Sequence, residues 1–215
     1  MFKIYKKEMK SYLMSPLGYI YLTAFFLITS ILFIWLNVLQ SSSNFGAVLI
    51  NLRLALMIFV PTITMKLLVE ERRNKTEQLL FTVPLETSDI VIGKFLAGVT
   101  MLLLTLVVTW VYPLILSCIT SVYFPELISI YIGFFLLGTS FIAMCLFLSS
   151  FTESPIVSFL VGIGSIFGLW IFEVLTNYIN NRFAREFVDA FCLIQKYGDF
   201  NAGVLNITLM KVKLT

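Results

Sequence analysis

The chain has 215 residues, of which 59% are apolar and 13% are charged, whereas an ordinary soluble domain has about 45–50% apolar and about 25% charged residues. One soluble core of this size cannot bury so much apolar surface, so the excess must face lipid. The net charge of +3 is too small and too dispersed to indicate a nucleic-acid partner. The sequence has no histidine and no C-x-x-C spacing among its three cysteines, which excludes histidine-based catalysis and a zinc site within this chain.

Five apolar stretches are each long enough to cross the hydrocarbon core as a helix, which takes roughly 20 residues. They cover residues 17–39, 51–69, 92–118, 127–149 and 156–176. Pro61 can kink the second stretch, and we expect Gly93-Lys94-Phe95 to lie in the membrane interface before the third. The pattern predicts an all-α, polytopic membrane protein with one transmembrane domain over residues 1–215.

The distribution of basic residues sets the expected orientation, because Lys and Arg are retained on the cytoplasmic side. Lys3, Lys6, Lys7 and Lys10 precede the first span, further basic residues lie between the second and third spans, and loops 40–50 and 119–126 have none. We therefore expect a multi-pass protein of the plasma (bacterial inner) membrane with a cytoplasmic N-terminus. The amphipathic tail, residues 177–215, would then be external, although its own basic residues oppose that placement.

Two polar segments could contact cytoplasmic partners. Residues 1–16 place the four lysines around an apolar face, which indicates an interfacial helix on the cytoplasmic side; the alternative is a topology signal without a docked helix. Residues 70–89 contain the densest charge cluster of the chain and a central proline, which predicts a helix, a turn and a second helix. This segment is either a solvated loop or a docking surface for a cytoplasmic protein.

Within the spans, a few residues are candidates for a role beyond filling the bilayer. Glu173 is a carboxylate inside an apolar run, and Arg53 lies at the same level of the second span and could be its partner; the simpler interpretation is that Glu173 reaches water at the outer interface. Gly164 and Gly168 would let another helix approach closely, which favours helix packing over a functional role.

The chain lacks the parts of an ATPase. A Walker A motif reads G-x-x-x-x-G-K-[ST], and Gly93-Lys94 has neither the upstream glycine nor the following hydroxyl. We therefore expect that the chain is not an enzyme and carries no cofactor of its own.

Several short motifs, in order and at matching places on this topology, are similar to those of one membrane protein family. They are Glu8-Met9-Lys10-Ser11-Tyr12, Ser15-Pro16-Leu17-Gly18-Tyr19, Pro61-Thr62-Ile63-Thr64-Met65, Glu70-Glu71-Arg72-Arg73, Thr76-Glu77-Gln78-Leu79-Leu80 and Gly93-Lys94-Phe95. On these motifs the chain resembles the membrane subunit of ATP-binding-cassette transporters of the type 2 permease family, especially the gliding-motility-like branch. The resemblance covers residues 1–208.

The resemblance implies the permease subunit of an exporter, which pairs with a second permease subunit and with separate cytoplasmic ATPase subunits that bind ATP and Mg²⁺. In such families the N-terminal interfacial helix and the loop after the second span rest against the ATPase, and this loop acts as a coupling helix. Carried onto this chain, the residues that would transmit nucleotide-driven movement are Glu70, Glu71, Arg72, Arg73, Thr76 and Glu77. The resemblance thus favours a docking surface over a solvated loop.

The family has a six-helix permease fold, whereas only five spans are expected here, so the resemblance implies that the chain is truncated or frame-shifted before a sixth span. The alternative function is a membrane scaffold or regulator that binds the ATPase but lacks a complete pathway. ATP-dependent cargo flux would distinguish a permease from such a scaffold.

Overall fold

The computed structural model describes residues 2–42, 44–73, 87–120 and 123–176, and all regular structure within these ranges is helical. The elements are α1 (Phe2–Leu13), α2 (Pro16–Phe33), its π-helical continuation η1 (Ile34–Val38), α3 (Gly46–Arg73), α5 (Thr87–Thr109), α6 (Val111–Ser117), α7 (Phe124–Ser149) and α8 (Pro155–Thr176). The predicted tail, residues 177–215, and most of the predicted coupling segment lie outside the described residues.

Four helical segments are long and apolar enough to cross a membrane: Pro16–Val38, Gly46–Leu67, Ser88–Ser117 and Phe124–Ser149. The apolar part of α8, Pro155–Ile171, is shorter. The all-helical class and the multi-pass character predicted from the sequence are therefore confirmed for the described residues, with four candidate spans rather than the five expected.

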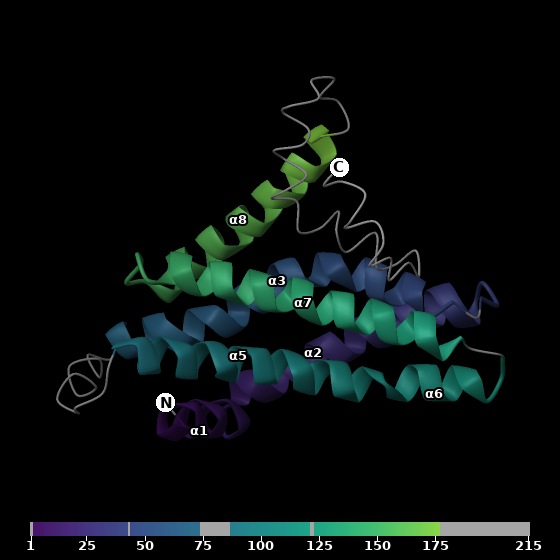
Figure 1. Ribbon diagram of the computed structural model, residues 1–215, viewed down its shortest axis with the longest axis horizontal. Helices are drawn as coiled ribbons and strands as arrows, with labels where there is room; N and C mark the ends of the chain where they lie inside the picture. The colour runs from purple at the N-terminus through teal and green to yellow at the C-terminus, as the bar shows by residue number, and fades with distance from the viewer. Residues whose placement is uncertain (1, 43, 74–86, 121–122, 177–215) are drawn as a thin grey trace, which may run out of the picture.

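Helix α3 lies at the centre of the bundle, where it packs against α2, α5, α7 and α8 (Figure 1). Its buried apolar residues recur every three or four positions along one broad face, the pattern of a helix that packs on neighbours through that face. They are Val48, Leu49, Leu52, Leu56, Phe59, Val60, Ile63 and Leu67. By contrast, α2 is at the edge: 28% of its most apolar stretch is buried in the protein, compared with 56% for α7.

Two of the predicted spans contain a proline, and one of the two is interrupted. Pro61 does not interrupt α3, which continues from Gly46 to Arg73. The third predicted span, in contrast, is broken at Trp110 into α5 and α6. Pro113 lies one turn later and has no N–H to donate to the carbonyl of Thr109, which explains why the helix is interrupted at this point.

An aromatic cluster joins several helices beside this break. The ring centroid of Tyr131 lies 5.1 Å from that of Trp110 and 6.3 Å from that of Phe45, which in turn lies 6.2 Å from Tyr112. The Tyr112 hydroxyl is 2.6 Å from the Ser30 hydroxyl of α2. Rings of this kind with a polar tip suit the boundary between lipid and water.

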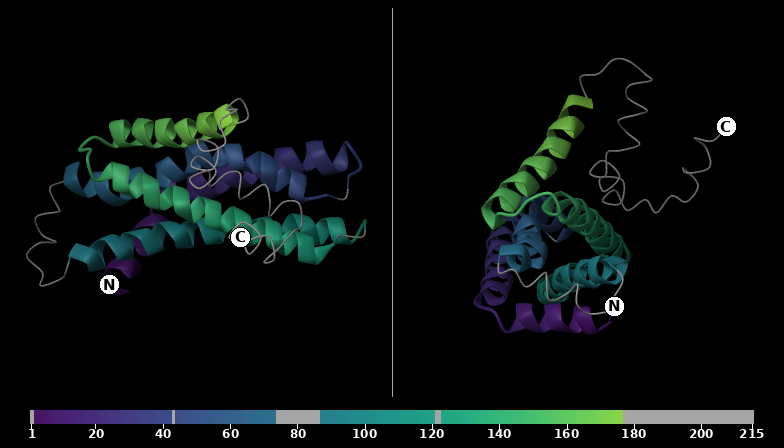
Figure 2. Two further views of the ribbon diagram at one scale, coloured as in Figure 1. Left: turned by 45° about the horizontal axis from the view of Figure 1, so that its top comes forward. Right: turned by 90° about the vertical axis from the view of Figure 1, so that its left-hand side faces the viewer.

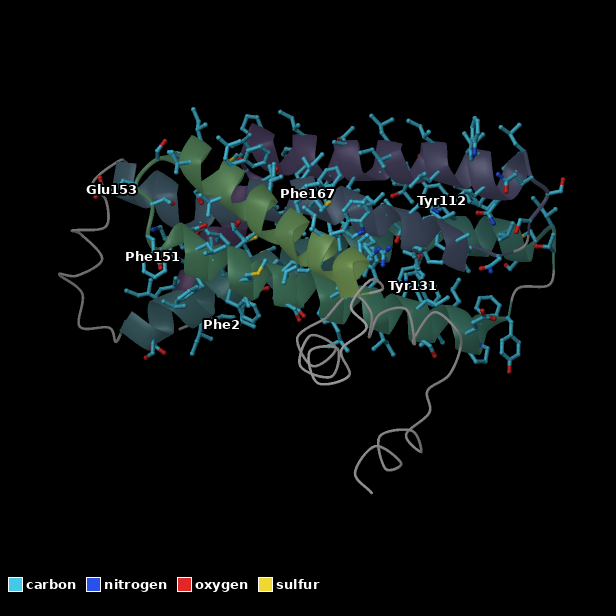
Figure 3. All side chains as sticks on the ribbon, turned by 90° about the horizontal axis from the view of Figure 1, so that it is seen from above. Phe2, Tyr112, Tyr131, Phe151, Glu153 and Phe167 are labelled. Atoms are coloured by element: carbon cyan, nitrogen blue, oxygen red, sulfur yellow. The ribbon has the colours of Figure 1, made fainter. Side chains whose placement is uncertain are left out.

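The aromatic cluster and the α7–α8 turn lie at opposite ends of the bundle. Figure 3 shows Tyr112 and Tyr131 toward one end and Phe151 and Glu153, both in the turn, toward the other. The end that carries the turn also carries the close of α3 and the start of α5, which lie side by side in Figure 1. The molecule therefore has two distinct ends, as a membrane-spanning bundle requires.

Helix α8 is fastened to the bundle through its first half. The Ser158 hydroxyl is 2.7 Å from that of Ser149 on α7, and Gly162 lies against Pro61 and Cys145. Farther along, Gly164 and Gly168 have no described atom within 4 Å of the position a Cβ would take, the atoms of their own helix left aside. The predicted close approach of another helix at these two glycines is therefore not made by the described part of this chain.

We expect Gly162→Ala to destabilise the fold by about 1–3 kcal/mol, the usual cost of overpacking a tight contact. The added Cβ would lie 2.9 Å from the Pro61 Cβ and 3.1 Å from its Cγ, and a proline ring cannot swing aside. Unfolding of the purified protein in detergent, followed by tryptophan fluorescence, measures the effect. Gly168→Ala is the matched control and should leave stability unchanged or slightly raised; an equal loss in both variants would contradict the α3–α8 packing.

Candidate functional site

Helix α1 runs across the bundle rather than along it, and it packs mainly on α5 (Figure 2). Ile4, Glu8 and Tyr12, spaced one turn apart, are buried, while Lys6, Lys7 and Lys10 are exposed. The side chain of Lys3 lies outside the described residues. The amphipathic pattern expected for residues 1–16 thus forms a docked helix; its contact with the membrane interface remains a prediction.

The most unusual feature of this contact is a buried ion pair. The Lys94 Nζ of α5 lies 3.1 Å from the Glu8 Oε1 of α1, and the two side chains are 2% and 9% exposed. Among the residues the structure describes, these are the only buried charged side chains. Removing charges from water costs several kcal/mol for each ion, so the pair requires close geometry and further hydrogen bonds.

Lys94 also connects the ion pair to a third helix. Its ammonium group donates a hydrogen bond to the backbone carbonyl of Leu67 on α3. The ammonium group of Lys94, on α5, therefore binds α1 through the Glu8 carboxylate and α3 through the Leu67 carbonyl. A charge-assisted hydrogen bond of this kind is stronger than a neutral one.

Neutral hydrogen bonds flank the ion pair on both sides. The Tyr5 hydroxyl lies 3.1 Å from the Thr100 hydroxyl of α5, and the Tyr12 hydroxyl donates to the Ile63 carbonyl of α3 at 2.7 Å. We call these residues, together with Glu8, Leu67 and Lys94, the α1 junction. It holds α1 against α3 and α5 at three successive points along the helix.

Lys66 closes the corner between α1 and α2. Its ammonium group donates to the Ser15 hydroxyl at 2.6 Å and to the Ser11 carbonyl at 3.3 Å, and it lies 4.9 Å from the centre of the Tyr12 ring. The end of α1 is therefore joined to α3 by a cation in addition to the Tyr12 hydrogen bond.

The predicted coupling residues lie next to this junction along the chain. Glu70, Glu71, Arg72 and Arg73 form the last described turn of α3, with side chains outside the described part, and Thr76 and Glu77 lie outside it entirely. Leu67 is about 9 Å from the end of α3, and Lys94 is about 10 Å from the start of α5, at 1.5 Å per residue. The α1 junction thus contacts α3 and α5, the two helices that lead to the predicted coupling segment.

The other predicted residues are not gathered at this site. Arg53 lies on α3 about five and a half turns from the end of the helix and is half-buried, whereas the Glu173 side chain lies outside the described residues. Their predicted pairing therefore remains a prediction.

Sequence reasoning missed the two charges of the α1 junction as functional candidates. Lys94 was expected in the membrane interface, which remains a prediction. The sequence did not indicate that Lys94 is buried, 1% exposed, where α5 packs on α1 and α3. The signal was present: Glu8 is an acidic residue among lysines, and it falls on the apolar stripe between Ile4 and Tyr12. A lone charge on an apolar face requires a partner elsewhere.

Comparison with known proteins adds one finding. The model of a family described as "ABC-2 family transporter protein" matches residues 6–210, nearly the whole chain. No curated protein and no solved structure shows a significant match to the sequence.

Proposed function

The chain belongs to the ABC-2 family of transporter proteins, and on this premise we propose that it is the membrane-spanning permease subunit of an ATP-driven exporter. In this proposal it belongs to the gliding-motility-like branch, pairs with a second permease subunit, and receives separate ATPase subunits on its cytoplasmic face. The observation that supports the proposal most is the α1 junction, which fixes α1 to the two helices that flank the predicted coupling segment. No observation on the described helices favours the alternative of a scaffold without transport activity.

The proposed coupling surface consists of residues 70–89 together with the exposed side of α1. Three lysines are exposed on that side, Lys6, Lys7 and Lys10, where they can meet acidic lipid or protein groups, whereas the opposite side of α1 is buried. Helix α3 extends past Leu67 to Arg73, and in this proposal its charged last turn belongs to the surface that the ATPase contacts. Movement of an ATPase at this end would act directly on α3 and α5.

Co-purification tests the proposed ATPase partner. We expect the tagged chain, extracted from its native membrane in mild detergent, to carry an ATPase. Reversing the charges of Glu70, Glu71, Arg72 and Arg73 should reduce the bound ATPase by about tenfold, because the reversed charges would face like charges on the partner. Glu126→Lys is the control, since Glu126 begins α7 at the other end of the bundle. An ATPase that stays bound to the reversed chain would contradict the assigned surface.

The proposed topology has five crossings, with α8 as the fifth and the N-terminus in the cytoplasm. Cys118, which is exposed at the end of α6, should then react with a membrane-impermeant maleimide in intact cells. A cysteine placed at Glu153, exposed in the α7–α8 turn, should react only after the membrane is opened, in a chain whose other cysteines are replaced. If instead Cys118 reacts only after the membrane is opened and the cysteine at position 153 reacts in intact cells, the topology is the reverse of the one proposed.

A further inference from the structure

We propose that Glu8 and Lys94 are positioning residues that fix α1 to α3 and α5, so that α1 forms part of the surface on which the ATPase rests. The inference builds on the proposed function and assigns the task of holding that surface together to one ion pair. It concerns the place of α1 and not a direct contact of either charge with the ATPase, because both side chains are buried, at 9% and 2% exposure.

The geometry makes the ion pair the central fastening of the α1 junction. Glu8 lies between Tyr5 and Tyr12 on the same side of α1, and each tyrosine hydroxyl forms its own hydrogen bond, one to α5 and one to α3. Among the described residues of the α1 junction, Lys94 alone connects all three helices, through the Glu8 carboxylate and the Leu67 carbonyl. Loss of Glu8 therefore removes the point at which α1 meets both neighbours together.

The ion pair also specifies where α1 sits along the bundle. Apolar contacts such as those of Ile4 tolerate sliding, whereas a shift of α1 by one turn, about 5.4 Å, would separate the carboxylate from the ammonium group. Buried polar groups can fix the register of packed helices in this way. A defined register matters here because α1 and the ends of α3 and α5 must present one surface.

The consequence of breaking the pair follows from its location. In Glu8→Gln, the buried ammonium group of Lys94 loses its ion pair with the Glu8 carboxylate, which is strongly unfavourable. Helix α1 lies at an outer edge of the bundle, as Figure 2 shows, so we expect that its detachment is the least costly way for water to reach Lys94. We therefore expect α1 to leave the bundle while the remaining helices stay packed.

Cysteine labelling measures the place of α1 directly. The parent chain carries Ile4→Cys, because Ile4 is 4% exposed against the bundle; it keeps Cys145, which is buried in the bundle core, and has Cys118→Ser and Cys192→Ser. In membranes that contain the full complex, Glu8→Gln should raise the rate of maleimide labelling at position 4 by roughly tenfold or more. Cys145 should remain unlabelled, which shows that the bundle is intact.

Three further variants separate positioning from other roles. Lys94→Met should behave as Glu8→Gln does, and Tyr5→Phe, which loses only a neutral hydrogen bond, should change labelling by less than about threefold. The double variant Glu8→Leu with Lys94→Met removes both charges of the ion pair, so it should shield position 4 again. The ATPase that co-purifies should fall by about fivefold in each single charge variant and return in the double variant.

The outcomes distinguish the inference from the proposed function. A shielded position 4 in Glu8→Gln would show that the ion pair does not hold α1. The inference would also be overturned if a single charge variant bound the full amount of ATPase while position 4 was exposed. The same holds if the double variant shielded position 4 but bound little ATPase. If no ATPase accompanies the parent chain, the proposed function fails, while the labelling rates still decide whether the ion pair fixes α1.

Discussion

The backbone amides of α1 (Phe2–Leu13) should exchange about 100-fold faster with deuterium in Glu8→Gln than in the unaltered chain. Removing one partner of a buried ion pair costs about 3–5 kcal/mol, and each 1.4 kcal/mol corresponds to about a factor of ten in an opening equilibrium. Lys94 keeps its hydrogen bond to the Leu67 carbonyl, which places the expected change toward the lower part of that range. Hydrogen–deuterium exchange with mass spectrometry, performed on the protein in lipid nanodiscs, resolves α1 as separate peptides.

A double-mutant cycle turns this exchange experiment into a measure of the interaction itself. Glu8→Leu and Lys94→Met are combined, and the double variant should recover most of the protection that each single variant loses. Peptides from the centre of α7, such as those around Phe134, serve as the internal control, because Phe134 is fully buried and α1 packs mainly on α5 and α2 rather than on α7. Additive losses in the cycle would mean that Glu8 and Lys94 do not interact in solution.

Gly18→Ala should destabilise the protein by about 3 kcal/mol, the upper part of the range for overpacking. A Cβ at Gly18 would lie 2.1 Å from the Tyr12 carbonyl oxygen and 2.9 Å from its carbonyl carbon. These are backbone atoms, so no side chain can turn away to make room. The corner between α1 and α2 must open instead, which would strain the Tyr12 hydrogen bond to Ile63.

Gly164→Ala is the matched control for Gly18→Ala. It adds the same methyl group to a helix, at a site where the described neighbouring helices leave the Cβ position open. Alanine also has the higher helix propensity, by up to about 1 kcal/mol, so this variant should be as stable as the parent or more so. Thermal unfolding in detergent compares the two, and a Gly18→Ala protein that unfolds with the parent would contradict the tight α1–α2 corner.

Much of the helical framework could be predicted from hydropathy, because a bilayer requires long apolar helices whose backbone groups are paired internally. The stretches expected at residues 51–69 and 127–149 correspond to α3 and α7, although both helices begin before the expected stretch and α3 also ends after it. Periodicity also indicated the buried side of α1. The break at Trp110 was missed, because the apolar run masks Pro113, whose missing N–H interrupts the helix.

The α1 junction could not be predicted in the same way. Glu8 and Lys94 are far apart in the sequence. The place of Glu8 on the apolar stripe of α1 indicates that it needs a partner but not which residue this is, and Lys94 alone has an ordinary explanation as an interfacial anchor. Their 3.1 Å contact depends on how α1 crosses α5, which is a tertiary property. By contrast, the charged cluster at Glu70–Arg73 could be identified from the sequence, and the structure adds that these residues form the last turn of α3.

Photo-crosslinking from α1 tests most directly whether this end of the molecule receives an ATPase. A photoreactive amino acid at Lys10, exposed on α1, is compared with the same amino acid at Cys118, exposed at the opposite end. The proposed function predicts that the amino acid at position 10 crosslinks to a protein with a Walker A motif. The same amino acid at position 118 should give no such adduct. An ATPase adduct from Cys118 alone, or none from either position in the native membrane, would contradict it.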